Sequence, residues 1–272
     1  MNYRHTYHAG NFADVVKHLL LTTVIQAVSR KPTPFCFLET HAGVGLYALN
    51  EARAQKNKEY ENGIGKLFFD QSSVPAFAQP YLDVVRQYNA PNKLAYYPGS
   101  PLIALSLLRE HDKMICCELH PEDYVALKEN FRHQSQVAVH HLDGYLGLKA
   151  FLPPKLKRGL VLIDPPFEQP NEFEKIAESV KAALQHWCAG HYLIWYPIKS
   201  TKKVADFYRL VKTWKIPYLG LQFTLDHNPS AALSSCGVLL LNPPWKMDVL
   251  WQQTVLPYLS HCLTGRGVVF SR

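Results

Sequence analysis

The feature that most constrains the fold of this chain is an alternation of short apolar runs with longer segments of helical periodicity. The apolar runs are rich in Val, Ile, Leu and aromatic residues, which favour buried strands. Strands that alternate with helices form a mainly parallel sheet with helices on both faces, so the sequence predicts a doubly wound α/β fold. The expected strands are residues 35–40, 114–118, 136–141, 159–164, 191–196, 218–225 and 237–241, with a short last strand at 267–271, and the expected helices are 101–110, 121–133, 171–187, 200–214 and 246–261.

Two segments add to this alternation. Residues 9–30 are typical of one amphipathic helix ahead of the first strand, with Asn11 as its N-cap. The interval between the first and second strands is much longer than one helix needs. Its polar, helical composition predicts an inserted helical subdomain at residues 50–95. Apart from this insertion, residues 1–272 are expected to form a single domain.

The composition bounds the cellular setting and the kind of partner. Hydrophobic residues make up 47% of the 272 residues, which is enough for a sizeable core. The formal net charge of +7 favours a polyanionic partner such as nucleic acid. A merely basic enzyme would have the same charge, and charge alone does not separate RNA from DNA. No apolar run is long enough for a transmembrane helix and no signal peptide is evident, so we expect a cytoplasmic protein without a membrane partner.

The cysteines and histidines give no indication of a metal site. The six cysteines include no C-x-x-C pair, and the histidines lack Cys or carboxylate partners at ligand spacing. We therefore expect reduced thiols and no bound metal. Nothing in the sequence requires a second subunit, so we expect a monomer.

The fourth expected strand ends in the most informative motif, Asp164-Pro165-Pro166-Phe167. An acid at the carboxyl end of such a strand lies where open α/β sheets bind ligands. Two prolines fix φ and remove ladder donors, so the turn is stiff. It presents a carboxylate, a carbonyl and an aromatic face together, which suits a flat heterocycle with an exocyclic amino group. The structural alternative is an ordinary strand end with a Pro-Pro turn.

Weaker signals follow the first three strands. Residues 43–48 match G-x-G-x-x-A, a turn that both dinucleotide and S-adenosylmethionine sites use. Glu118, after the second strand, can accept two ribose hydroxyls, or it can simply cap the next helix. After the third strand, Asp143 can accept from an adenine amino group and the Gly144 N–H can face a ring nitrogen, or the pair can form a tight turn. A single pocket at one sheet edge would explain all of these signals together with Asp164.

Two further motifs need an interpretation. Ser100, followed by Pro101, is expected to be the N-cap of the helix before the second strand, and it can also face the pocket. The segment Asn242-Pro243-Pro244-Trp245 repeats the form of the Asp164 motif, but it follows one of the last strands and carries no charge. We therefore interpret it as a structural turn into the last helix.

At these residues the chain resembles the RlmJ family of 23S ribosomal RNA adenine-N6 methyltransferases, Class I enzymes that use S-adenosyl-L-methionine and a catalytic D-P-P-[YF] motif. The resemblance spans nearly the whole chain, insertion included. The motifs that carry it are Tyr3-Arg4-His5, His8-Ala9-Gly10-Asn11, Ala13-Asp14-Val15, Lys17-His18, Thr40-His41-Ala42-Gly43, Tyr96-Tyr97-Pro98-Gly99-Ser100-Pro101, Glu118-Leu119-His120-Pro121, Asp143-Gly144, Ile163-Asp164-Pro165-Pro166, Trp195-Tyr196-Pro197 and Asn242-Pro243-Pro244-Trp245.

The resemblance implies a Rossmann-like Class I methyltransferase fold, with a mostly parallel seven-stranded sheet, helices on both faces and the inserted helical subdomain. It implies S-adenosyl-L-methionine as cofactor and 23S ribosomal RNA as partner, with Tyr3 meeting the RNA near the active site. Phe167 stands where the family commonly has Tyr, a change that keeps stacking and removes a phenol hydrogen bond. The implied catalytic residues are Asp164, Pro165 and Phe167, and the implied cofactor-binding residues are His18, His41, Ser100, Glu118, Asp143, Gly144 and Asp164.

The expected chemistry is direct in-line methyl transfer to N6 of a flipped-out adenosine. The amino lone pair is delocalised into the ring, so the Asp164 carboxylate and the Pro165 carbonyl are expected to accept its two hydrogens and free the lone pair for attack. The base must leave its stack to enter the site. The alternatives are methylation of DNA adenine, of another RNA or of a guanine amino group, a nicotinamide-dependent oxidoreductase that uses residues 43–48, and a noncatalytic RNA-binding protein.

Overall fold

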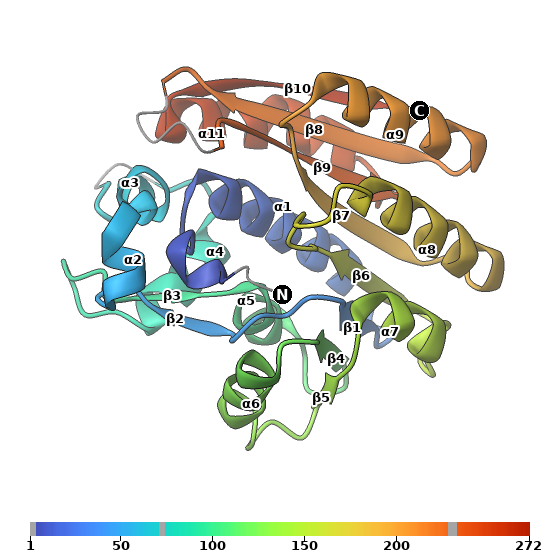
Figure 1. Ribbon diagram of the computed structural model, residues 1–272, viewed down its shortest axis with the longest axis horizontal. Helices are drawn as coiled ribbons and strands as arrows, with labels where there is room; N and C mark the ends of the chain where they lie inside the picture. The colour runs from blue at the N-terminus through green and yellow to red at the C-terminus, as the bar shows by residue number, and fades with distance from the viewer. Residues whose placement is uncertain (1–3, 71–73, 228–232) are drawn as a thin grey trace.

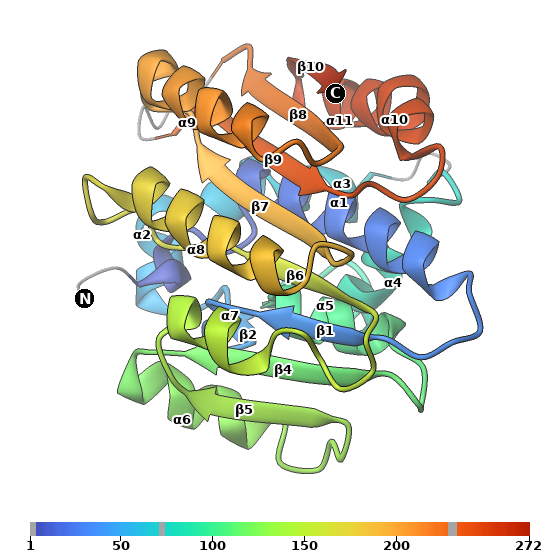
Figure 2. The same ribbon diagram turned by 90° about the vertical axis from the view of Figure 1, so that its right-hand side faces the viewer.

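The computed structural model describes residues 4–70, 74–227 and 233–272 (Figure 1). At its centre lies an eight-stranded sheet in the order β10-β8-β9-β7-β6-β1-β4-β5, with helices on both faces (Figures 1 and 2). The strands are β1 (Cys36–Glu39), β4 (Lys113–Glu118), β5 (Val137–His141), β6 (Gly159–Ile163), β7 (His191–Pro197), β8 (Tyr218–Leu225), β9 (Ser235–Leu241) and β10 (Gly265–Ser271), and β2 (Leu46–Ala48) pairs with β3 (Tyr96–Pro98) in a separate two-stranded sheet.

The predicted α/β fold is confirmed, with one correction to the strand count. Strands β5, β4, β1, β6 and β7 are parallel neighbours. Strand β9 runs antiparallel between β7 and β8, and β10 runs antiparallel to β8. The expected number of seven strands was wrong by one, because the short last strand pairs with β8 along residues 265–271 and becomes a full edge strand.

Two hydrophobic clusters, one on each face of the sheet, hold the helices in place. Helices α1, α4, α5, α6 and α11 contribute to one cluster, and α7, α8 and α9 contribute to the other. Figure 2 shows α7, α8 and α9 in front of the sheet. The helices are α1 (Phe12–Ser29), α2 (Ala52–Asn57), α3 (Ile64–Phe68), α4 (Gln79–Gln87), α5 (Ser100–Leu107), α6 (Pro121–Asn130), α7 (Gly144–Phe151), α8 (Glu172–His186), α9 (Thr201–Thr213), α10 (Met247–Leu250) and α11 (Leu256–Leu263), with short 3-10 turns η1 (His5–Tyr7) and η2 (Glu59–Asn62).

Helix α1 is the central helix of the first cluster. Asn11 caps it as predicted, since the Asn11 side chain accepts a hydrogen bond from the Asp14 N–H at 3.0 Å. By length and composition α1 would suffice to cross a membrane, but 83% of that stretch is buried inside the protein. Core helices pass the same test, and the burial accounts for the apolar sequence of α1.

The segment between β1 and β4 contains α2, η2, α3, α4 and the β2–β3 pair. The glycine turn after β1 therefore leads into a strand, β2, where a dinucleotide-binding domain would have a helix. Gly43 and Gly45 have φ values of +63° and +84°, in the left-handed region that favours glycine. Without a helix N-terminus behind it, this turn lacks the pyrophosphate-binding element of nicotinamide enzymes.

Two helices differ from the prediction. Residues 144–151 form α7, which the sequence did not predict, because Asp143-Gly144 was interpreted as part of a ligand site or as a tight turn and not as a helix start. The helix expected at 246–261 is divided into α10, a π-helical turn η3 (Trp251–Val255) and α11. Pro257 has no N–H to donate to the turn before it, which accounts for the wider turn at this point.

Candidate active site

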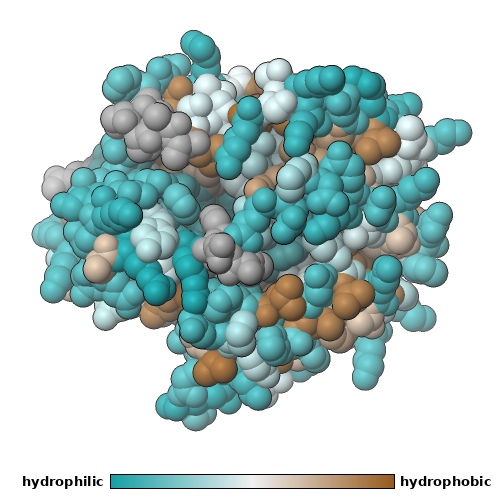
Figure 3. Space-filling model, viewed as in Figure 1, coloured by the Kyte–Doolittle hydropathy of each residue, from teal (hydrophilic) through white to brown (hydrophobic). Residues whose placement is uncertain are grey.

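A cavity of about 390 Å³ opens at the carboxyl ends of the parallel strands. Figure 2 shows these strand ends on its left, and Figure 3 looks onto the same face, where hydrophilic side chains predominate over α2, α8 and α9. Nearly all of the predicted site residues line this one cavity, namely His18, His41, Ser100, Glu118, Asp143, Gly144, Asp164, Pro165 and Phe167. Tyr3 lies outside the described residues.

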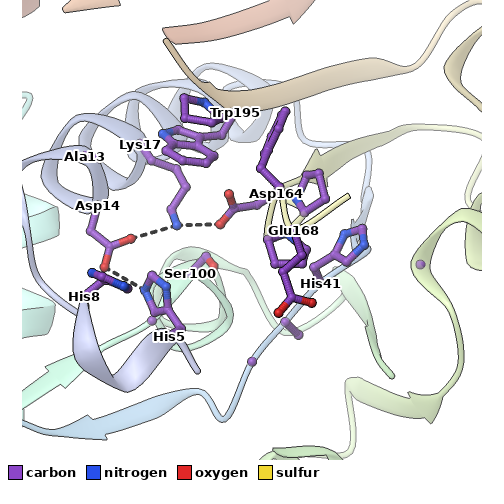
Figure 4. A pocket seen from close by; sticks show the side chains of 18 of the residues that line it. His5, His8, Ala13, Asp14, Lys17, His41, Ser100, Asp164, Glu168 and Trp195 are labelled. Atoms are coloured by element: carbon purple, nitrogen blue, oxygen red, sulfur yellow. Dashed lines mark hydrogen bonds and ion pairs between the residues drawn. The ribbon is translucent and has the colours of Figure 1, made fainter. Parts of the chain in front are cut away.

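A chain of charged side chains crosses the cavity floor (Figure 4). The Lys17 ammonium lies 2.5 Å from Asp164 Oδ2 and 2.8 Å from Asp14 Oδ1. On the other side of Asp14, its Oδ2 lies 2.9 Å from His5 Nε2 and accepts the Gly10 N–H at 2.9 Å. Lys17 thus ties the strand-end carboxylate to helix α1 through one carboxylate oxygen.

Burial and pairing act in opposite directions on these groups. Burial favours the neutral form of Asp14, but the charges of His5 and Lys17 outweigh it and hold the pKa of Asp14 well below its usual value. Burial likewise disfavours a charged Lys17, yet Asp14 and Asp164 raise the pKa of Lys17 well above its usual value. The pair is therefore ionic at neutral pH, and each charge depends on the other.

The Asp164-Pro165-Pro166-Phe167 turn ends in an unusual backbone. Phe167 has φ of +51°, which is an outlier for a bulky residue and costs free energy. Its ring contacts Phe173 at 5.1 Å and Trp195 at 5.9 Å between centroids, both edge to face. The strained turn is held by these contacts, and it places an aromatic ring and Asp164 in one cavity.

Glu118 lies at the end of β4 and is almost fully buried. Its two oxygens accept the backbone N–H of Gly43 at 2.8 Å and of His120 at 2.7 Å. Burial raises the pKa of Glu118, and these hydrogen bonds oppose that effect. The carboxylate thus joins the glycine turn to β4, and it is not the exposed helix cap that was the alternative interpretation.

Asp143 and Gly144 form the start of α7. Asp143 Oδ1 caps the helix by accepting the Tyr145 N–H at 2.8 Å and the Leu146 N–H at 3.2 Å. A Cβ on Gly144 would lie 2.1 Å from the Thr40 carbonyl oxygen, so only glycine fits between β1 and α7. The pair thus begins a helix where a tight turn was the alternative interpretation, and both residues also line the cavity.

The two predicted histidines differ in their surroundings. His41 Nδ1 lies 2.8 Å from the Thr40 hydroxyl, and burial lowers the pKa of His41 to about 4. His18 stacks on Tyr97 and lies 2.6 Å from its hydroxyl through Nδ1. Among the described residues, the buried His18 Nε2 has no hydrogen-bond partner. No group of three or more His, Cys, Asp or Glu side chains in the described ranges is arranged to hold a metal ion.

Ser100 was expected to be the N-cap of helix α5, but this prediction was wrong. Gly99 occupies the N-cap position without a side-chain bond, and the Ser100 hydroxyl donates to Glu39 Oε1. Glu39, at the end of β1, is fully buried, and burial raises its pKa to about 8. The serine hydroxyl therefore provides a hydrogen bond to a buried acid.

The Asn242-Pro243-Pro244-Trp245 segment lies away from the cavity. Because β9 is antiparallel to β7, the carboxyl end of β9 lies at the opposite edge of the sheet. There the Asn242 side chain donates to the carbonyls of Cys188 and Gly190 at 2.7 and 2.8 Å. The interpretation of this segment as a structural turn is confirmed.

The sequence reasoning assigned no role to Asp14, Lys17, Glu39 or Trp195. Asp14, Lys17 and His18 occupy positions i, i+3 and i+4 on one side of a helix that is otherwise apolar, and all three are buried. Charged residues at that spacing inside an apolar helix were the signal that could have identified them. Glu39 is the last residue of β1, as Glu118 is the last residue of β4. Its position at a strand end could therefore have marked it as a candidate site residue.

Comparisons with known proteins agree with this arrangement. Residues 32–269 match the family described as "Ribosomal RNA large subunit methyltransferase D, RlmJ". "Ribosomal RNA large subunit methyltransferase J" of Escherichia coli is 37% identical over 98% of this chain and 95% of the relative, and the protein of that name in Haemophilus influenzae is 36% identical over the same shares. A crystal structure of a Legionella pneumophila protein superposes with a TM-score of 0.89 at 32% identity, covering 97% of this chain and 98% of that one. The chain belongs to the RlmJ family of ribosomal RNA large subunit methyltransferases.

Proposed function

We propose that this chain is an S-adenosyl-L-methionine-dependent methyltransferase that methylates N6 of a specific adenosine in 23S ribosomal RNA. The single observation that carries the proposal is the position of the Asp164-Pro165-Pro166-Phe167 turn in one cavity with Glu118 and Asp143. The relatives that match over nearly the whole chain are named for methylation of large-subunit ribosomal RNA. The lack of a helix behind the glycine turn favours this activity over a nicotinamide-dependent one.

The polar groups of the cavity fit the proposed cofactor. Glu118 is placed to accept from a ribose diol, and Asp143 from an adenine amino group, each at the end of a neighbouring strand. His18 Nε2, buried and without a partner among the described residues, can bond to a polar group of the methionine part. Together with His41, Ser100 and Gly144, these residues would hold S-adenosyl-L-methionine, which supplies an electrophilic methyl group on a sulfonium.

In this proposal Asp164, Pro165 and Phe167 prepare the amine for attack. The Asp164 carboxylate and the Pro165 carbonyl accept the two N6 hydrogens, so the nitrogen lone pair leaves conjugation with the ring. Phe167 supplies a stacking surface for a base that has left its own stack. The strained backbone at Phe167 fixes the ring before the base arrives, which lowers the ordering cost of binding.

Lys17 orients Asp164 in the same step. Its ammonium holds the Asp164 carboxylate in one orientation through the contact with Oδ2. The other carboxylate oxygen then remains for the substrate amine. After methyl transfer the excess proton on N6 passes to Asp164 or to water, and no metal or covalent intermediate takes part.

The wider setting of the activity is also part of the proposal. We infer that residues 1–272 act as one methyltransferase domain with residues 50–95 as its inserted helical subdomain. The protein is expected to act in the cytoplasm as a monomer, with Tyr3 contacting the RNA. The alternative is an N6-adenine methyltransferase that acts on DNA or on another RNA, because the cavity recognises the base and not the whole polymer.

Mass spectrometry of 23S ribosomal RNA from a deletion strain tests the proposal. One adenosine should lose its N6-methyl group, and the wild-type gene should restore it. Asp164→Asn should fail to restore the methyl group, although the purified variant should bind S-adenosyl-L-methionine and unfold at nearly the wild-type temperature. An unchanged level of N6-methyladenosine in 23S ribosomal RNA after deletion would refute the choice of substrate. Substantial methylation by Asp164→Asn would refute the assigned catalytic residue.

A further inference from the structure

Two lysines that line the cavity, and a third that follows one of them by three positions, have no role in the proposed chemistry. Lys175 on α8 and Lys199 after β7 both line the cavity, and Lys202 lies in the first turn of α9. Lys199 and Lys202 are exposed, and Lys175 is partly exposed. Within the described ranges none of the three forms an ion pair or a side-chain hydrogen bond. Their neighbour Lys203, in contrast, donates to the Pro170 carbonyl at 2.8 Å and fastens α9 to the loop after Phe167.

The acids that line the same cavity are already engaged. Glu59 lies 3.0 Å from His8 Nδ1, and Asp123 accepts from Arg4 at 2.7 Å. Glu172 accepts from the Tyr145 hydroxyl at 2.6 Å. Glu168 lies on the His41 side of the cavity (Figure 4). In the described ranges none of these acids forms an ion pair with the three lysines, so the lysine ammonium groups stay available to a ligand from solution.

Lys199 lies near the N-terminal segment, which lines the same cavity. The hydrogen bond that His8 makes to the Glu59 carboxylate raises the pKa of His8, while the charge of Lys199 acts against this increase. Lys199 is therefore close to His8, which lies at the other end of the chain and lines the same cavity.

Fold stability does not explain these lysines. A cation in the first turn of a helix is disfavoured by the helix dipole, which makes Lys202 unfavourable for α9. Unpaired like charges around one cavity also repel each other. Lysine ammonium groups on flexible stems are suited to phosphates, which set the register of a nucleic acid without reading its sequence.

We propose that Lys175, Lys199 and Lys202 form a phosphate clamp that holds the RNA backbone on both sides of the target adenosine. The clamp rests on the proposed function, since it assumes that the flipped base enters this cavity. Because its contacts are with the backbone, the clamp should affect RNA binding and leave methyl transfer within the bound complex largely unchanged.

The test compares two triple variants of the full-length protein. The clamp variant is Lys175→Gln, Lys199→Gln and Lys202→Gln. The control variant is Lys149→Gln, Lys155→Gln and Lys181→Gln, which removes the same charge from exposed positions outside the cavity. Binding of a fluorescently labelled single-stranded RNA 12-mer is measured by anisotropy from low to high salt. Methylation of a 23S ribosomal RNA transcript is measured in parallel.

The clamp variant should show a salt slope of log K smaller than wild type by about 2, at roughly 0.7 for each lost phosphate contact on a single strand. Its KM for the transcript should rise about 10-fold or more, with kcat within about twofold of wild type and unchanged cofactor affinity. The control variant should follow wild type in KM. Equal slopes for the two triple variants would overturn the clamp. If wild type methylates no RNA, the proposed function fails, while the anisotropy result still decides whether these lysines bind a nucleic-acid backbone.

Discussion

Replacement of Lys17 by methionine removes the charge that lies between two carboxylates. Methionine keeps most of the volume of the lysine stem, so the change acts mainly on the electrostatics. Asp14 and Asp164 lose their shared partner, and Asp14 is almost fully buried. At 2.8 Å, one such pair attracts by about 6 kcal/mol in an effective dielectric of about 20.

The net loss of stability is smaller than this attraction, because the lysine no longer has to be desolvated. Removal of one partner of a buried pair typically costs about 3–5 kcal/mol. His5 remains on the far side of Asp14, which places the expected loss near the lower bound, about 3 kcal/mol. For a chain of this size the melting temperature should fall by roughly 10 °C.

The assay is urea unfolding followed by tryptophan fluorescence at pH 7, with the cofactor absent. Lys56→Met serves as the matched control, because Lys56 is exposed, and it should change stability by less than about 0.5 kcal/mol. The double variant Lys17→Met, Asp14→Asn should recover part of the loss, since it removes the unpaired buried charge. A Lys17→Met protein as stable as the Lys56→Met control would show that the ion pair does not hold α1 to β6 as described.

Three further outcomes are expected. Phe167→Ala should lower kcat/KM for RNA about 5- to 150-fold, the equivalent of about 1–3 kcal/mol of stacking. Phe167→Tyr should keep a kcat/KM near the wild-type value. Equal activity of wild type and both variants in the methylation assay would exclude stacking on this ring. Because burial lowers the folded-state pKa of His41 to about 4, the unfolded chain binds the extra proton first, so stability should rise as the pH rises from about 4 to 6.5. His41→Asn should flatten that part of a pH series of unfolding midpoints, and an unchanged profile would contradict the buried neutral histidine. Asn242→Ala should lower stability by about 1–3 kcal/mol through its two lost carbonyl contacts, while kcat/KM stays at the wild-type value, and a selective loss of activity would contradict the structural role of that turn.

The sequence predicted the sheet well because its signals are local. Strand β6 is apolar at every position and ends at an acid and two prolines, so periodicity and turn chemistry agree on its bounds. Helix α7 escaped prediction because Asp143-Gly144 favours a tight turn as strongly as a helix start. The π-helical turn before Pro257 escaped for a related reason, since one missing N–H widens a turn without ending the helix.

Residue patterns alone indicated the site only where a residue stands at or just after a strand end, whereas His18 and His41 were indicated only by the family resemblance. Glu118 ends β4, Asp143 follows shortly after β5 and Asp164 follows β6. These strands and β1 are four parallel neighbours in the sheet, so topology brings the three acids to one edge without knowledge of side-chain contacts. The bond between Lys17 and Asp164 joins residues 147 positions apart, and no periodic pattern encodes such a distance. The role of Ser100 was missed likewise, because its partner Glu39 lies 61 positions away on another element.

Helix α1 has a consequence for how the pocket can open. The helix that supplies Asp14, Lys17 and His18 is also among the most deeply buried segments of the protein. Backbone amides in such a segment exchange with solvent deuterium mainly through global unfolding, whereas exposed loops exchange through local opening. The α1 wall of the cavity should therefore stay closed on the timescale of cofactor exchange. Ligands then enter and leave on the side of the loops after β6 and β7, and deuterium uptake should be fast there and slow along α1.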